Sequence, residues 1–347
     1  MDFKKEVEYA ELLSPLKGFE LERQIVEHRY DPLTGRGTVV ATGRFSYAKR
    51  LFESDPKEVQ RLVESTKASC PFCPEQLERS TPRFAPGIAE EGRITVDDVV
   101  LFPSLFAHME YNALAVISKE HFLPLRSLAP ERLRKALEAG LTYVKRVHAH
   151  LKSTLYFSFV ENHFPLSGST VVHPHVQILA SRSPFNLLRE LLERSREYRT
   201  KTGRNYWLDL IDAEERGERF LGILGDAFWL VPYAPMSTYE VWSISRDFSN
   251  IADMEAGGLS GFVEGVARVL EFFEDEGLSC FNLALYSGPL GDDSSGYFRA
   301  GLRLIGRSGY RPPYVSDFWG LQTLLLEGES YDAPENMARK LRPYFDR

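Results

Sequence analysis

The residues best suited to chemistry are two histidines and a glutamine at alternate positions, His173, His175 and Gln177. They lie in a stretch from 167 to 180 that is rich in β-branched and apolar residues, which is typical of a strand. Because side chains alternate faces along a strand, all three would project to one side. Imidazole can ligate a metal or act as a nucleophile near neutral pH. The pattern therefore predicts a chemically active strand, although such histidines also occur in strands without a function.

A second candidate for chemistry is the motif Cys70-Pro-Phe-Cys73. Two thiols at this spacing can share a metal ion, and two imidazoles would complete a tetrahedral zinc site. The same motif also resembles a glutaredoxin-type redox pair, which starts a helix in a small βαβ domain. Here it follows a helical stretch and precedes Pro74 and a loop-like segment at 80–87. These surroundings favour a metal-binding knuckle over a redox pair.

Composition excludes several classes of protein. The chain has 347 residues, 43% hydrophobic and 12% aromatic, so it can bury a sizeable core and is long enough for two domains. The net charge of −7 argues against a general nucleic-acid binder. No apolar run reaches membrane-spanning length, and the acidic start is no signal peptide. Three cysteines make no disulfide framework, so a reduced, cytoplasmic setting is expected.

The sequence pattern indicates a degenerate internal repeat. Residues 101–121 and 229–247 both read as a strand, a turn with proline, and an alternating strand that ends in serine and charge. Matching Ser118 with Ser245 gives an offset of 127 residues (245 − 118). The offset carries the three chemically active positions onto Ala300, Leu302 and Leu304. All eight histidines lie at or before position 175, so only the first copy would keep a site.

Helical patterns follow each group of strands, at 129–148 and again at 258–273. A charged helix at 184–198 would connect the two copies. The order of strands and helices predicts an α+β fold with antiparallel sheets and packed helices. We expect a catalytic half at 1–198 and a degenerate half at 199–347.

Taken together and in order, these features resemble the galactose-1-phosphate uridylyltransferase family, the transferase branch of the histidine-triad superfamily. The matching segments are His28 to Arg44, Cys70 with Cys73, Ser118-Lys-Glu-His121, Glu161-Asn162 with Gly168, His173-Pro174-His175-x-Gln177, and Ala333 to Arg342. The resemblance covers most of the chain. It implies two histidine-triad-like halves, each an antiparallel sheet with packed helices.

The resemblance also implies roles for individual residues. The zinc ligands would be Cys70, Cys73, His121 and His173. His175 would be the nucleophile of a ping-pong reaction, attacking the α-phosphorus of a nucleotide sugar and holding the nucleotide until a phosphorylated acceptor collects it. The Pro174 carbonyl would accept the other ring N–H of that histidine and fix its tautomer.

Gln177 marks the transferase branch in this resemblance, because the hydrolases carry a third histidine at the equivalent place. A neutral amide can donate a hydrogen bond to a phosphoryl oxygen without titrating near pH 7. A nucleotide hydrolase therefore ranks below a transferase. The candidate substrate contacts are Gln177 itself, Arg44, Asn162, Gly168, Ser169 and Thr170.

The sequence also departs from the family. Thr170-Val-Val replaces the usual Ser-Asn-Pro, a second metal site cannot form without later histidines, and only Gln322 and Glu327 could stand in for the hexose-binding pair. By resemblance, the chain is a UDP-glucose:hexose-1-phosphate uridylyltransferase of galactose metabolism that forms homodimers. The alternatives are an ADP-sugar phosphorylase, with phosphate as acceptor, and a zinc-stabilised nucleotide-binding protein without transferase activity.

Overall fold

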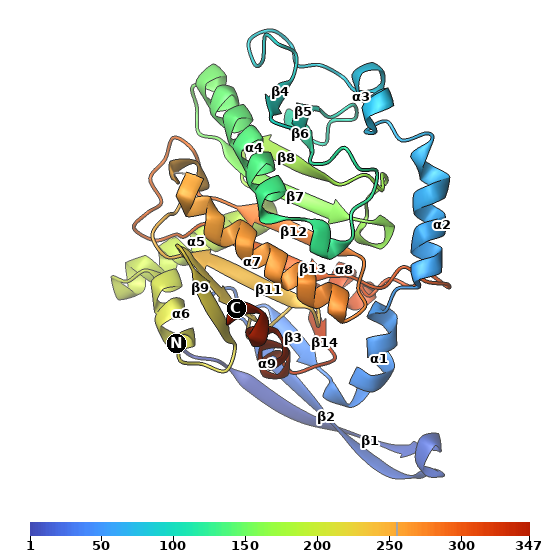
Figure 1. Cartoon of the computed structure of the whole chain (residues 1–347). Coiled ribbons are helices and arrows are strands. Elements are labelled where there is room, and N and C mark those ends of the chain that lie inside the picture. The colour runs from blue at the N-terminus through green and yellow to red at the C-terminus, as the bar shows by residue number, and fades with distance from the viewer. Residues whose placement is uncertain (255) are drawn as a thin grey trace.

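A computed structural model of the chain describes residues 1–254 and 256–347 (Figure 1). Its centre is a ten-stranded sheet in which each neighbouring pair of strands is antiparallel. In sheet order the strands are β4 (Ile94–Val96), β5 (Val99–Pro103), β6 (Tyr111–Val116), β8 (His175–Ser181), β7 (Tyr156–His163), β12 (Phe281–Tyr286), β13 (Gly301–Gly306), β11 (Glu240–Ser245), β10 (Ala227–Leu230) and β9 (Phe220–Leu224). The expected α+β class is confirmed.

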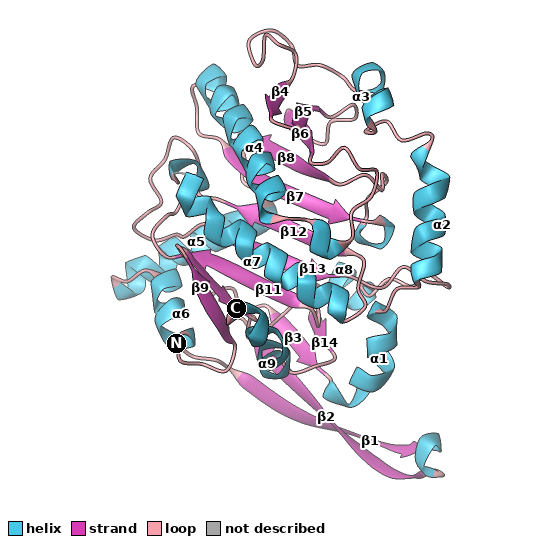
Figure 2. Cartoon of the chain, in the orientation of Figure 1, coloured by secondary structure: helices cyan, strands magenta, loops and turns pink. Residues whose placement is uncertain are grey.

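Helices cover both faces of this sheet (Figure 2). The first face is covered by α4 (Pro130–Leu151), α7 (Ala256–Asp275) and α9 (Pro334–Phe345), which share the main core with the sheet. The second face is covered, beside β10 and β11, by α5 (Asn186–Thr202) and α6 (Tyr206–Glu214). We call these the helix face and the site face, because the candidate site lies on the second. The expected boundary at 198/199 falls inside α5.

The two halves of the chain contribute mirrored sets of strands. The order β4-β5-β6-β8-β7 comes from the first half, and β12-β13-β11-β10-β9 continues it from the second. The halves join where β7 pairs with β12 over six residue pairs, from Ser158↔Tyr286 to His163↔Phe281. The sequence had led us to expect a sheet in each half, whereas the structure joins them into one.

The offset of 127 residues is wrong for the direction of the side chains. It equates His175 with Leu302, but Leu302 belongs to the main core of the helix face, together with Val176. His175 lies on the opposite face. Arg303 lies on that face too, since its partner Trp242 on the neighbouring strand is outside the main core. Side chains alternate along a strand, so an odd error in an offset moves every residue to the wrong face.

The two long helices approach the sheet through glycines. A Cβ built on Gly140 of α4 would lie 2.2 Å from the ring of Phe159, and one built on Gly265 of α7 would lie 2.1 Å from the indole of Trp229. A methyl group at either position would therefore force the helix away from the strands. Each half thus holds its helix against the sheet by the same device.

The N-terminal strands form a second sheet against the second half. It has the order β1 (Lys5–Ser14), β2 (Glu20–Tyr30), β3 (Gly37–Val40) and β14 (Gly328–Ser330), with β3 and β14 parallel. Thr38 donates a hydrogen bond to the Pro235 carbonyl, and Arg29 forms an ion pair with Glu335 of α9. Beyond the sheet, β1 and β2 continue as a projecting ribbon (Figure 1).

Shorter elements connect the sheets. The turn η2 (Thr42–Arg44) leads into α1 (Phe45–Phe52), α2 (Pro56–Lys67) and α3 (Pro74–Ser80), and α8 (Gly320–Leu324) precedes β14. Among the described residues, no helix combines the length and the apolarity needed to cross a bilayer.

Candidate metal centre and active strand

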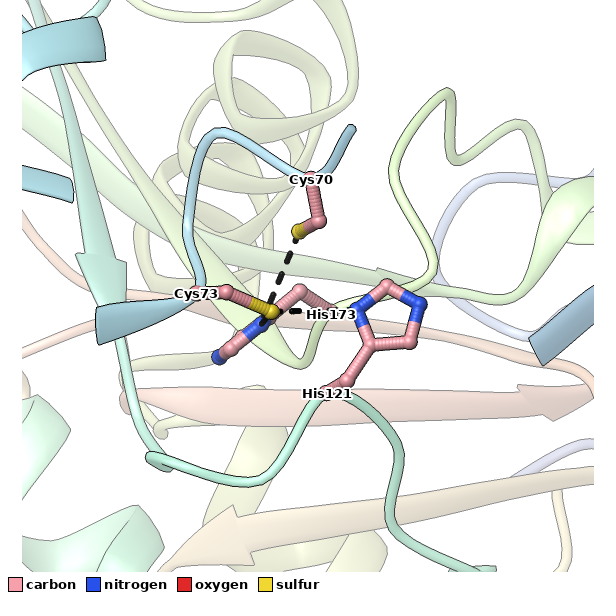
Figure 3. A group of neighbouring side chains, drawn as sticks. All are labelled: Cys70, Cys73, His121 and His173. Carbon is pink, nitrogen blue, oxygen red and sulfur yellow. Dashed lines mark hydrogen bonds between the residues drawn. The ribbon is translucent and has the colours of Figure 1, made fainter. Parts of the chain in front are cut away.

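Four side chains that suit a metal ion meet beside the start of β8 (Figure 3). Cys70 and Cys73 come from the loop between α2 and α3, His121 from the segment after β6, and His173 from just before β8. One ligand atom from each lies within 4.8 Å of all the others, and all four residues are buried. The structure thus brings together the four residues that the resemblance implied as ligands.

The distances fit a tetrahedral ion. The Cys73 Sγ lies 3.5 Å from His121 Nδ1 and 3.6 Å from His173 Nδ1, and the Cys70 Sγ lies 3.7 Å from the latter. Tetrahedral zinc bonds of about 2.3 Å to sulfur and about 2.05 Å to nitrogen separate the two ligand types by about 3.6 Å. These three distances therefore match those expected between the ligands of a tetrahedral zinc ion.

Outer hydrogen bonds orient both imidazoles. The Nε2 of His173 lies 2.8 Å from the Ser118 carbonyl, which can only accept, so this nitrogen carries the proton. The Nε2 of His121 lies 3.0 Å from the Thr66 hydroxyl, which itself donates to a backbone carbonyl. Each ring therefore turns the Nδ1 lone pair toward the cysteines, as metal-ligating histidines do.

Burial keeps Cys73 and His173 uncharged in the absence of a cation. Burial, with a smaller effect of Cys70, raises the pKa of the Cys73 thiol to about 12. Burial also lowers the pKa of His173 to about 4. At neutral pH the histidine is ready to ligate, whereas the thiol loses its proton only to a bound cation.

The local sequence explains the knuckle. Cys73 precedes Pro74, which has no N–H and occupies the first helical position of α3, and the Cys73 carbonyl accepts from Leu77. The loop-like segment expected at 80–87 follows α3, a short helix that was not expected. A helix after the motif is also a feature of redox pairs, but the two histidines beside the sulfurs favour a metal.

The ring of His175 is held in one tautomer. Its Nδ1 lies 2.8 Å from the His173 carbonyl, so Nδ1 donates and Nε2 keeps a lone pair. The prediction that the Pro174 carbonyl accepts from this ring is wrong. That carbonyl points along the sheet and accepts from the backbone N–H of Ile117. The edge of the Phe72 ring packs on His175 with the centroids 5.2 Å apart. The knuckle therefore contacts the candidate nucleophile directly.

Gln177 lies one step along the same face. It pairs with Leu114 on one side and with Val160 on the other, and all three side chains are partly exposed. His175 pairs with Val116, which faces the knuckle. The first half thus presents an imidazole and an amide on a floor that α5 and α6 do not cover.

A chain of polar contacts reaches this face from the second half. Asn162 pairs with Asn282, which donates to its side-chain oxygen. Arg307 donates to the Asn282 oxygen at 2.6 Å and forms an ion pair with Asp317. Because the Asn162 oxygen accepts this hydrogen bond, its NH₂ group is the part of the side chain that could donate to a ligand.

The loop between β7 and β8 uses several candidate contacts for its own structure. Gly168 has a φ of 95°, which favours glycine, and the hydroxyl of Ser169 donates to the Val171 carbonyl. Thr170 is exposed. Arg44 ends η2, and its side chain lies outside the described residues. Binding roles for these four positions stay predictions.

Glu161 and His163 turn to the helix face and so away from this site. Their side chains are buried, with His163 Nδ1 3.4 Å from a carboxylate oxygen of Glu161. The imidazole stacks on Phe281 with the centroids 5.0 Å apart. His163 is thus a core residue.

The site face of the second half is filled. Arg303 lies in the same cross-strand row as Gln177, through Val160 and Ala284. Its guanidinium donates to the buried carboxylate of Glu240, which also accepts from Trp242. The space left around Arg303 and Trp242 is a cavity of about 30 Å³. Such a space holds a water molecule or two and no nucleotide.

Sequence reasoning missed three neighbours of the site. Phe72 lies inside the cysteine motif and could have been read as a contact there. Asn282 and Arg307 carry no local signal, because only the pairing of β7 with β12 brings them to the first half.

Comparisons with known proteins place the fold. No protein-family model matches the sequence. An uncharacterized protein of Archaeoglobus fulgidus is 28% identical over 345 residues, which cover 99% of this chain and 98% of that one.

Solved structures give the clearest likeness. An ADP-glucose phosphorylase from Arabidopsis thaliana, solved with bound ADP-glucose, superposes with a TM-score of 0.68 at 17% identity, over 91% of this chain and 98% of that one. Another solved structure from Arabidopsis thaliana, of a protein described as GalT-like, gives 0.68 at 16% identity over the same shares. A uridylyltransferase gives 0.65 at 18% identity, over 92% and 98%. The chain therefore has the fold of the galactose-1-phosphate uridylyltransferase-like proteins, as the sequence predicted.

Proposed function

We propose that this protein is a nucleotidyltransferase that carries a nucleoside monophosphate on Nε2 of His175. The observation that carries the proposal is the hydrogen bond from Nδ1 of that ring to the His173 carbonyl, which leaves the Nε2 lone pair free. A fixed tautomer with one free lone pair is what nucleophilic catalysis by imidazole requires. The donor would be a UDP- or ADP-hexose.

In the first step, Nε2 would attack the α-phosphorus while the bond from that phosphorus to the bridging oxygen breaks. Sugar 1-phosphate leaves, and the positive charge that develops on the ring is stabilised by the hydrogen bond from Nδ1 to the carbonyl. In the second step, an oxygen of a phosphorylated acceptor attacks the same phosphorus, and the bond to Nε2 breaks. The side chains of Gln177 and Asn162 would donate to the phosphoryl oxygens in both steps.

Zinc held by the cysteines and histidines of the knuckle would supply structural stability rather than Lewis acidity. Its ligands are all protein side chains, as in closed structural sites. His173 would fix the start of β8, and Phe72 would restrict the ring of His175. The metal centre would thus position the nucleophile.

A specific observation favours phosphate as an acceptor, as in an ADP-sugar phosphorylase. Gln322 is buried, and its side-chain oxygen accepts from the Trp319 backbone. The carboxylate of Glu327 lies over Gly37, where a Cβ would be 2.2 Å from it. Both stand-ins for a hexose-binding pair are therefore engaged in packing. These contacts support nucleotidyl transfer without supporting a hexose acceptor, so we do not propose a role in galactose metabolism.

Intact-mass spectrometry after incubation with UDP-glucose, and separately with ADP-glucose, tests the proposal. We expect a gain of one nucleoside monophosphate with one of the two donors, and no gain in His175→Ala. Adding phosphate or a hexose 1-phosphate to the adduct would then identify the acceptor by which one restores the original mass. Zinc-loaded protein that gives no adduct with either donor would overturn the proposal and favour nucleotide binding without transfer.

A further inference from the structure

Helix α2, which leads into the metal knuckle, is held only weakly along its length. None of its twelve residues is buried, whereas α4, α5 and α9 each bury several. In Figure 1 the helix stands beside the large sheet, between α1 and α3. An isolated helix of about twelve residues is marginal in water, so the attachments at its two ends must keep it in place.

The start of α2 is fixed to the second half of the chain. Asp55, which precedes the helix, donates its backbone N–H to the Tyr310 carbonyl at 3.0 Å. The Ser54 hydroxyl accepts from the Tyr310 N–H at 2.9 Å and lies 2.6 Å from the Ser279 hydroxyl. These hydrogen bonds join two parts of the backbone directly and need no metal.

The last turn of α2 is fixed to the metal centre of the first half. The Thr66 hydroxyl donates to the Leu62 carbonyl at 2.8 Å, so it accepts from Nε2 of His121, which is 3.0 Å away. The helix ends at Lys67, and Cys70 begins the knuckle shortly after it. This end of the helix is therefore attached to groups that a bound metal would hold in turn.

Between its ends α2 covers an apolar groove of about 440 Å³. Val59 and Val63 line the groove from the helix, and Phe122, Leu125 and Leu278 line it from the rest of the chain. A space of this volume is as large as many sites for small molecules. The middle of the helix is therefore packed loosely, and its contacts alone cannot replace a lost attachment at one end.

The same helix supports the loop between β7 and β8, which carries several candidate substrate contacts. The apolar side of α2 packs against a cluster of Phe164, Val172 and Cys280. Phe164 begins the loop, and Val172 lies near its end, next to the metal ligand His173. If α2 moved away, one side of this loop would lose its support.

We propose that α2 is a strap whose order depends on metal occupancy. With the metal bound, the knuckle and His121 hold the last turn of the helix, so the strap covers the groove and supports the loop. Without the metal, the strap comes away from the first half and stays attached only through Ser54 and Asp55. Metal occupancy thereby switches the site between a supported and an open state. The inference rests on the metal centre of the proposed function and not on the transfer reaction.

Hydrogen exchange with mass spectrometry tests the strap in the full chain, with zinc bound and after a chelator has removed it. Amides at 60–67 should exchange at least about 10-fold faster without zinc, within a labelling time over which α4 stays protected in both states. Loss of protection in α4 together with α2 would mean that the first half unfolds as a whole. Faster exchange confined to 68–80 would mean that only the knuckle responds. Either result would overturn the proposal.

A matched pair of substitutions tests the attachment of the strap at saturating zinc. Thr66→Val removes the hydroxyl that accepts from His121, whereas Thr66→Ser retains it. Thr66→Val should weaken zinc binding at least about 10-fold in competition with a chromophoric chelator, and it should speed exchange at 60–67 in the zinc-loaded protein. Thr66→Ser should do neither.

The outcomes separate this inference from the metal assignment. Weaker zinc binding by Thr66→Val without faster exchange at 60–67 would overturn the strap alone. Wild-type protein that holds no zinc would overturn the metal centre and the strap together. The nucleotide adduct, measured in the same sample by intact mass, reports on the transfer reaction separately from both.

Discussion

The two halves of the large sheet have the same order of strands, but their site faces are covered differently. In the first half, the buried ring of His175 and the partly exposed side chain of Gln177 lie beside the metal-ligand cluster. In the second half, α5 and α6 cover β10 and β11, and the buried pair of Arg303 with Glu240 takes the place of a site. The helix face differs little, since α4 and α7 both pack through a glycine. The two halves therefore differ in the residues and helices that cover the strands, and not in the arrangement of the strands themselves.

The largest expected effect is the loss of activity on removing the candidate nucleophile of the first half. His175→Ala should lower the rate of nucleotidyl transfer by at least about 10⁴-fold, because it removes the atom that bonds to phosphorus. The free energy of unfolding should change little by comparison. Steady-state rates with the donor that labels the protein, together with urea denaturation, measure both. A variant that retained a tenth of the activity would place the nucleophile elsewhere.

Loss of the metal centre should destabilise the first half. Cys73→Ser should lower the free energy of unfolding by about 4 kcal/mol in zinc-saturated buffer, since a ligand at a thousand times its Kd stabilises by that amount. The loss should be accompanied by loss of bound zinc and of the response to a chelator. Cys280→Ala, at a buried cysteine outside the cluster, is the control and should keep both. Equal zinc contents in the two variants would contradict the assignment.

The buried pair of the second half should matter to stability and not to chemistry. Arg303→Leu leaves the Glu240 carboxylate buried without its partner and should cost about 3–4 kcal/mol. Adduct formation in the folded variant should match the wild type. Adding Glu240→Gln should recover most of the stability, because the unpaired charge is then gone. A loss of adduct formation in the single variant would mean that the second half takes part in catalysis.

A smaller and pH-dependent effect is expected where the N-terminal sheet meets the second half. Burial alone would raise the pKa of Glu335, but the hydrogen bonds and charges of Arg29 and Arg219 outweigh it and lower that pKa to about 2. A lowered carboxylate pKa stabilises the fold above the unfolded value, near 4.3, and the contribution disappears as the pH falls toward 2.

Glu335→Gln should therefore lower the free energy of unfolding by about 2 kcal/mol at pH 7. The difference from the wild type should shrink between pH 4.5 and pH 2. Denaturation curves at three pH values measure it. A difference that stays constant down to pH 2 would show that the ion pairs do not cause it.

The cluster of four candidate metal ligands and the strand beside it could be predicted because short motifs carry them. Cys70 and Cys73 share one turn, and the alternation of His173 and His175 determines their direction within one strand. The partners of these residues were harder to predict. The Pro174 carbonyl was expected to accept from the ring of His175, but the His173 carbonyl does so. Which of two neighbouring carbonyls faces the ring depends on the backbone conformation at the start of β8.

Relations between distant strands could not be read from the sequence. Nothing near Asn282 indicates that it contacts Asn162, because the pairing of β7 with β12 decides it. The repeat offset was wrong by an odd number of positions, which no local pattern in two apolar strands could reveal. The exposed ribbon was also missed, since its residues alternate like those of any half-buried strand.

The seam between β7 and β12 has a consequence for the modularity of the molecule. Cutting the chain between its halves would leave each fragment with a central strand turned into an open edge, whose unpaired N–H and C=O groups invite aggregation. Because the six residue pairs of the seam are shared, neither half has a complete set of hydrogen bonds by itself. The strands of the second half therefore complete the sheet of the first, and we expect that neither part of the chain can be deleted without exposing this edge.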